Sequence, residues 1–64
     1  MNFYLVSYTA TTKNHVMRNS AFEFASTCAE IARLTAEDLL GRDFTLKSFK
    51  ILGVELTKPK MLVL

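Results

Sequence analysis

Apolar residues recur every three or four positions from Ser26 to Gly41, and this spacing predicts an amphipathic helix over Cys28–Leu40. Projected at about 100° per residue, one face collects the residues that we expect to be buried: Cys28, Ile31, Ala32, Thr35 and Leu39. Leu34, Ala36 and Leu40 flank that face, and the charged residues Glu30, Arg33 and Glu37 gather on the opposite side. A helix this short needs packing to be stable, so we expect it to lie on a sheet.

End signals support the helix boundaries. Thr27 followed three residues later by Glu30 matches the capping box, in which each side chain bonds the backbone N–H of the other residue. Gly41 suits the left-handed position that often follows the last turn of a helix. A second capping pattern at Thr35 would break the helix near Leu34, but the apolar face keeps its phase there, which favours one continuous helix.

Alternation predicts a hairpin before the helix. The first strand covers Asn2–Ala10, with one row of side chains consisting of Tyr4, Val6 and Tyr8, and with Phe3 and Leu5 on the other row. A polar break at residues 11–14 predicts a turn. The second strand, His15–Ala25, alternates well only in its second half, so we expect a bulge near Arg18-Asn19-Ser20.

A third strand is predicted from Phe44 onward. Phe44 and Leu46 share one parity while Phe49 and Ile51 share the other, and this change of phase predicts a bulge at Lys47-Ser48. Gly53 indicates a second bulge or a tight turn. Pro59 cannot donate to a ladder and ends this strand, and Met61–Leu64 is apolar enough to predict a short fourth strand.

These elements predict one α+β domain over residues 1–64, in the order β-β-α-β-(β). The expected sheet is antiparallel, has three or four strands and carries the helix on one face. Its other face is left open, and the apolar residues exceed what one short helix can cover. We therefore expect this open face to pair with a partner or with a second copy of the chain.

Charge and composition narrow the class of protein. The 64 residues carry a formal net charge of +2, with acidic residues concentrated in the helix and basic residues in the strands. The single cysteine cannot form an internal disulfide, the first residues show no signal-peptide pattern, and no apolar run is long enough to span a membrane. We therefore expect a cytoplasmic protein that does not bind membranes.

Catalytic and metal-binding patterns are missing from the sequence. One histidine and one cysteine do not make a metal-ligand set, and two glycines do not make a phosphate-binding loop. Cys28 sits at the first turn of the helix, a position where reactive thiols occur, and His15 is the only imidazole that could pair with it, but the apolar face predicts a buried, inert thiol. We expect no enzyme activity and no cofactor.

Basic residues lie on the strands and turns, interleaved with aromatic residues, and this arrangement is typical of surfaces that bind anionic partners. The candidate partner-binding residues are Lys13, His15, Arg18, Lys47 and Lys50. The predicted bulge at Lys47-Ser48 would bring the side chains of Lys47 and Lys50 to one face. These lysines could equally protect an edge strand from pairing.

The chain also resembles small phage-encoded α+β proteins in size and element order, including some type I anti-CRISPR proteins. The resemblance covers the whole chain in architecture, without a diagnostic motif. It rests on a first strand rich in tyrosine and valine (residues 3–8), on Phe22-Glu23-Phe24, on Ser26-Thr27 before an alanine-rich helix, and on the basic alternating strand at residues 46–51. It implies a compact accessory protein that covers a surface on a host complex, and it assigns no functional residue.

Three functions remain open. The first is a non-catalytic phage or mobile-element protein that binds and inhibits a host protein or ribonucleoprotein complex, in the manner of an anti-CRISPR protein. The second is a small nucleic-acid-binding module, expected to be dimeric. The third is a protein–protein interaction subunit without nucleic acid. Steep salt dependence of binding would single out the second.

Overall fold

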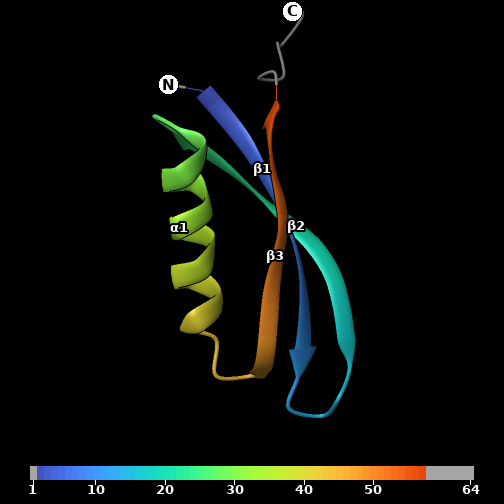
Figure 1. Cartoon of the computed structure of the whole chain (residues 1–64). Coiled ribbons are helices and arrows are strands. Elements are labelled where there is room, and N and C mark those ends of the chain that lie inside the picture. Colours follow the sequence, from blue (N-terminus) through green and yellow to red (C-terminus); the bar gives the residue numbers. More distant parts are fainter. Residues whose placement is uncertain (1, 58–64) are drawn as a thin grey trace, which may run out of the picture.

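The computed structural model describes residues 2–57, which form four elements: β1 (Asn2–Thr12), β2 (Met17–Ser26), α1 (Ala29–Gly41) and β3 (Leu46–Thr57). The strands form one antiparallel sheet in the order β2-β1-β3, and α1 covers one of its faces (Figure 1). This confirms the predicted α+β class and element order. The predicted fourth strand, Met61–Leu64, lies outside the described residues.

The central strand β1 separates the two faces of the sheet as its alternation predicts. Tyr4, Val6 and Ala10 point toward α1 and are buried. Phe22 and Phe24 from β2 and Ile51 and Val54 from β3 pack against the same core. The aromatic rings of Tyr8 and Phe22 stack at 4.9 Å, which extends this layer toward the end of the sheet.

The second strand is regular, and the predicted bulge near Arg18-Asn19-Ser20 is wrong. Its register with β1 runs without interruption from Asn2 opposite Ser26 to Thr11 opposite Met17. Arg18 and Ser20 lie on the same row of side chains as Phe22. This part of β2 lies near the C-terminal end of α1, where the two polar residues border a hollow with Leu39 and Leu40. Polar side chains are tolerated there without any break in the ladder.

The third strand contains two bulges, and its apolar spacing explains both. Ser48 and Leu46 pair with consecutive residues of β1, which leaves Lys47 as an extra residue; Gly53 and Ile51 likewise leave Leu52 extra. The apolar residues that face α1 are spaced three, two, three and two apart: Leu46, Phe49, Ile51, Val54 and Leu56. Each spacing of three needs one extra residue to keep side chains on one face. The bulge at Lys47-Ser48 is confirmed, but the strand begins at Leu46 rather than Phe44.

The ends of the helix differ from the predicted signals. Cys28 occupies the N-cap position without a side-chain cap, so the Thr27 capping box is wrong. Instead the hydroxyl of Ser26, which is buried, donates to the carbonyl of Cys28 at 3.0 Å and turns the chain from β2 into α1. Gly41 is the last helical residue and has no positive φ, so the predicted left-handed cap is also wrong. Arg42 follows in a right-handed conformation, and its side chain contacts Asp38 at 3.2 Å.

The buried face of α1 is rotated by roughly a quarter turn from the predicted face. Ala32, Ala36 and Leu40 are buried, whereas four residues of the predicted face are exposed: Cys28, Ile31, Thr35 and Leu39. Ala32 and Ala36 pack in the cluster that contains Val6 and Tyr4, because small side chains let the helix approach the sheet closely. The charged group is confirmed, since Arg33 contacts Glu37 at 2.6 Å and Glu30 at 3.9 Å.

The open face of the sheet mixes apolar with polar and small residues: its large apolar side chains include Phe3, Leu5 and the exposed Met17. Leu5 on β1 is flanked by Glu23 on β2 and Glu55 on β3. Toward the hairpin the remaining residues of this face are mostly small or polar: Ser7, Thr9, Thr11, Asn19, Ala21, Ser48 and Lys50. Much of the exposed apolar surface lies on α1 and on the segments beside it, at Ile31, Leu34, Leu39 and Phe44.

Candidate partner-binding surface

The β1–β2 turn holds Lys13-Asn14-His15 in a defined conformation. The backbone N–H of Thr12 donates to the carbonyl of Val16 at 2.8 Å, and the N–H of His15 donates to the carbonyl of Thr12 at 2.9 Å. The hydroxyl of Thr12 accepts from the N–H of Val16 at 3.1 Å. His15 adopts a φ of 65°, the left-handed conformation that closes three-residue hairpin loops. The turn is therefore ordered by its backbone and not by contacts of its basic side chains.

The loop between α1 and β3 is tied to this turn. The N–H of Lys13 donates to the carbonyl of Thr45 at 2.9 Å. Asp43 organises the loop, because its Oδ1 accepts from the hydroxyl of Thr45 at 2.6 Å and from the N–H of Thr45 at 2.9 Å. Phe44 stands between these anchored residues with 85% of its surface exposed. Two segments far apart in the sequence thus form one rigid end of the molecule.

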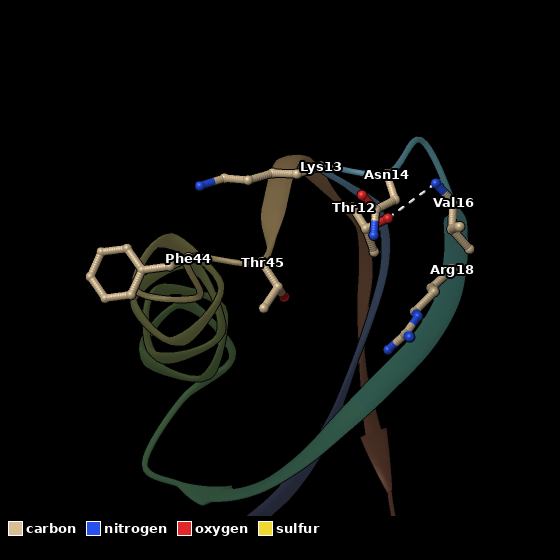
Figure 2. Close-up of a pocket in the computed structure, with 7 residues that line it drawn as sticks. All are labelled: Thr12, Lys13, Asn14, Val16, Arg18, Phe44 and Thr45. Atoms are coloured by element: carbon tan, nitrogen blue, oxygen red, sulfur yellow. Dashed lines mark hydrogen bonds between the residues drawn. The ribbon is translucent and has the colours of Figure 1, made fainter.

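An open groove of about 560 Å³ lies between the turn and the loop (Figure 2). We call it the turn groove; its lining residues are Thr12, Lys13, Asn14, Val16, Arg18, Phe44 and Thr45. Figure 2 shows Lys13 and Phe44 extending in the same direction, while Arg18 points from β2 into the space beside Thr45. The groove combines two cations, one amide and one exposed aromatic ring, a composition suited to recognition of a polypeptide surface.

Asp43 modifies the charge of the turn groove. The hydrogen bonds from the Thr45 hydroxyl and from the Thr45 backbone N–H hold the pKa of the Asp43 carboxyl below its ordinary value, with a smaller contribution from the charge of Arg18. The carboxylate is therefore ionised at neutral pH and offsets part of the positive charge of Arg18. Within residues 2–57, Lys13 forms no salt bridge with an acidic side chain, so it supplies the more available cation.

The structure brings together only some of the predicted site residues. Lys13 and Arg18 line the turn groove, and His15 belongs to the same turn but does not line it. Lys47 borders a separate hollow with Leu40 and Phe49, on the helix side of the sheet. Lys50 lies opposite Thr9 on the open face, so the bulge does not join the two lysines. Instead, the bulge at Lys47 keeps the apolar side chains of β3 on the face of the sheet that is turned toward α1.

Sequence reasoning also missed Asn14 and Thr45, and it assigned Phe44 to a strand. The signal that could have found the loop is Asp43-Phe44-Thr45, because an aspartate that bonds backbone two residues ahead is a turn pattern.

The other aromatic residues that we considered for stacking are not available for it. Tyr4 is buried in the core, and the ring of Tyr8 already stacks on Phe22. Phe49 faces the helix side of the sheet and has 37% of its surface exposed, less than half the value for Phe44. Phe44 is thus the aromatic side chain of this group that a partner can reach in full.

Other candidate chemistry finds little support in residues 2–57. Cys28 is exposed, which corrects the expected burial, and it lies at the opposite end of β2 from the turn that holds His15. In this part of the chain no three His, Cys, Asp or Glu side chains gather so that they could hold a metal ion. None of the described helices has the length and apolar character needed to cross a membrane.

Comparison of the chain with protein-family models, with curated proteins and with solved structures finds no match.

Proposed function

We propose that this chain is a non-catalytic accessory protein, of the kind that phages and mobile elements encode, which binds a host macromolecular complex and inhibits it. The resemblance to small phage-encoded proteins supplies the class of partner: a nucleic-acid-guided defence complex, as for type I anti-CRISPR proteins. The turn groove supplies the contact surface. Inhibition follows from occupation of the partner's surface and needs no chemical step.

The exposure of Phe44 carries this proposal. A phenylalanine with 85% of its surface in water contributes nothing to the core, yet the bonds that Asp43 makes with Thr45 hold the loop that presents it. Aromatic anchors on rigid segments are typical of residues that dominate binding energy, because they bury a large area at little entropic cost. Lys13 lines the same groove, extends in the same direction as this ring and can pair with a carboxylate on the partner.

The charge layout favours a protein surface over bare nucleic acid as the contacting group. The open face of the sheet mixes Lys50 with Glu23 and Glu55, and Asp43 offsets Arg18 near the turn groove. A track that follows a phosphate backbone needs a continuous run of cations, and this layout interrupts it. Mixed charge around an aromatic anchor matches the polar rim of a protein–protein interface.

The test measures target-DNA binding by a purified type I CRISPR ribonucleoprotein in the presence of this protein. We expect the wild-type chain to block DNA binding and Phe44→Ala to weaken the block by about 30-fold, the loss typical of a binding hot spot. The variants Lys13→Glu and Lys50→Glu form a matched pair, since both reverse an exposed lysine but only Lys13 lines the turn groove. Circular dichroism verifies that each variant is folded.

We expect Lys13→Glu to weaken inhibition and Lys50→Glu to leave it unchanged. Inhibition that survives Phe44→Ala and Lys13→Glu would remove the turn groove from the interface. No inhibition by the wild-type chain across complexes of this type would reject the defence complex as the partner.

A second candidate function, a small nucleic-acid-binding module, rests on the proximity of Lys13 and Arg18 to the exposed Phe44 ring. Fluorescence anisotropy with a labelled single-stranded oligonucleotide distinguishes it from the first. Binding that weakens steeply between about 50 and 200 mM salt and requires Phe44 would favour this module. Absence of oligonucleotide binding, together with inhibition of the complex, would favour the first function.

A further inference from the structure

The two edges of the sheet are built differently. Strand β3 at one edge is interrupted by extra residues at Lys47 and Leu52. Strand β2 at the other edge is regular over all ten of its residues, Met17–Ser26. Bulges prevent an edge from pairing with another strand, whereas a long regular edge presents a continuous row of unpaired backbone groups. Within residues 2–57, one edge of this sheet is thus protected and the other is open to pairing.

The hairpin bond between Thr12 and Val16 determines which backbone groups of β2 face outward. Antiparallel pairs alternate between bonded and non-bonded along a ladder. The N–H of Thr12 bonds to the carbonyl of Val16, so the pair Thr12–Val16 is a bonded pair. Because the register is unbroken, the even-numbered residues of β2 bond to β1. The odd-numbered residues, with Asn19, Ala21 and Glu23 at their centre, direct N–H and C=O away from the sheet. These residues have side chains on the open, solvent-exposed face.

The helix has an uncovered apolar flank on the same side. Leu39 borders a hollow of about 260 Å³ together with Ser20 and Phe22 of β2, so this flank of α1 is turned toward β2. Ile31 lies two turns earlier on that flank, and both side chains are about half exposed. The flank that carries the contact between Arg33 and Glu37 is turned the other way. The apolar face predicted from the sequence therefore lies on the β2 side of the helix.

We propose that two copies of this chain associate through their β2 edges to form a continuous six-stranded antiparallel sheet, with a two-fold axis at Ala21. In this arrangement both helices lie on the same face of the sheet. Their apolar flanks, with Ile31 and Leu39, turn toward each other across the axis. The pairing satisfies the outward backbone groups of β2 and covers the helix surface that the monomer leaves in water.

The sequence of β2 is complementary to itself in this register. Ala21 meets its own copy, and a small side chain at the axis avoids a clash. Asn19 lies opposite Glu23 of the partner subunit, where an amide can donate to a carboxylate. Arg18 lies opposite Phe24 of the partner subunit on the helix face, an arrangement that allows a cation–π contact. No like charges oppose each other along Met17–Ala25, which distinguishes a second copy from an arbitrary strand.

A cross-linking experiment tests both the pairing and its register. Ala21→Cys and Ala25→Cys are introduced separately into the full chain carrying Cys28→Ser, and each protein is exposed to a glutathione redox buffer. Bonded antiparallel partners have Cα atoms about 5.5 Å apart, within the range of a disulfide. The Ala21→Cys variant should therefore form a covalent dimer.

Ala25 provides the matched control, because it is an exposed alanine on the same face of the same strand. In the proposed register the two copies of residue 25 lie roughly 27 Å apart, eight strand positions from each other. The Ala25→Cys variant should remain monomeric on non-reducing gels. Equal cross-linking of both variants, or cross-linking of Ala25→Cys alone, would overturn the register.

Sedimentation velocity at several protein concentrations provides a second readout without cysteines. The wild-type chain should show a dimer that Ala21→Lys weakens at least tenfold, because two lysines then meet at the axis. Ser48→Lys adds the same charge to the open face on β3 and should leave the dimer unchanged. A wild-type chain that stays monomeric at all concentrations would overturn the proposal. This inference does not depend on the partner proposed above, and loss of the dimer leaves that function testable by inhibition.

Discussion

His15 adopts a backbone conformation that is strained for most residues other than glycine. Its φ of 65° lies in the left-handed region, which costs an ordinary residue about 1–2 kcal/mol. The residue is exposed, and its ring does not line the turn groove. Its backbone role in closing the hairpin is therefore separable from the chemistry of its imidazole.

Substitution of His15 should change stability in opposite directions depending on the new residue. His15→Gly should raise the free energy of unfolding by about 0.5 kcal/mol, because relief of strain exceeds the added chain entropy. His15→Val should lower it by about 1 kcal/mol or more, since a β-branched residue fits this region poorly. Urea midpoints measure both changes. Identical midpoints for the two variants would contradict the left-handed conformation.

Asp43 gives a pH-dependent prediction. Its pKa is lowered from an ordinary value of 3.8, chiefly by the Thr45 hydroxyl. A carboxyl with a depressed pKa in the folded state stabilises the fold above its unfolded pKa, and this contribution is lost as pH falls through the folded pKa. An NMR titration should therefore place the Asp43 midpoint below 3.8 in the wild type. The midpoint should rise in Thr45→Val, and an unchanged midpoint would show that the Asp43–Thr45 bond is absent in solution.

At the scale of elements, the helix depends on small residues at its contact with the sheet. Ala32 and Ala36 are fully buried and pack in the cluster with Val6. Ala36→Leu should destabilise the protein by about 1–3 kcal/mol, because the larger side chain forces the helix away from the sheet. Thr35→Leu places the same side chain one position away on an exposed site and should change stability by less than about 0.5 kcal/mol. Equal effects, measured by chemical denaturation, would restore the face that the sequence predicts.

The bulges of β3 can be tested by deletion. Removal of Leu52 leaves Ile51 opposite Tyr8 and Gly53 opposite Ser7, so the protein should fold with a change within about 1 kcal/mol. Removal of Lys50 from a regular stretch shifts one part of the strand by a residue and moves apolar side chains to the wrong face. That variant should lose its cooperative thermal transition by circular dichroism. Similar behaviour of both deletions would contradict the register.

The strands were more predictable than the helix, for a physical reason. Tyr4, Val6 and Tyr8 face the core because a two-residue period leaves only two choices of face. The change of phase between Leu46 and Phe49 locates a bulge in the same way. A helix can rotate continuously about its axis, so the sequence does not restrict its buried face to two choices. Here the close approach to the sheet that Ala32 and Ala36 allow outweighed the burial of the larger side chains of Ile31 and Leu39.

The candidate site was predictable only in part. Lys13 and Arg18 come close through the hairpin, which a sequence can indicate. Thr45 joins them through a bond from the N–H of Lys13 to its carbonyl, a contact between segments that no local pattern encodes. The expectation that a bulge would bring Lys47 and Lys50 to one face was wrong, because the bulge keeps the apolar side chains of β3 on the face toward α1 while Lys50 lies on the open face.

At the scale of the whole molecule, the core is small for the number of apolar residues. Val6 is the largest side chain that is fully buried in the described residues. Val6→Ala should destabilise the protein by about 2 kcal/mol, a large share of the roughly 3–10 kcal/mol expected for a domain of this size. The thermal midpoint should fall clearly, whereas Val16→Ala at an exposed position should leave it nearly unchanged. A small effect at Val6 would indicate a core located elsewhere.

The central position of β1 has a consequence for synthesis on the ribosome. β1 pairs with β2, its neighbour in sequence, but also with β3, whose residues emerge last of the four elements. The hairpin can close within microseconds of its release. Residues 27–57, from the end of β2 to the end of β3, take about 2–6 seconds to be translated. During that interval the nascent chain presents the unpaired side of β1 together with the side chains of Tyr4 and Val6, and this exposed strand edge favours aggregation until β3 is released.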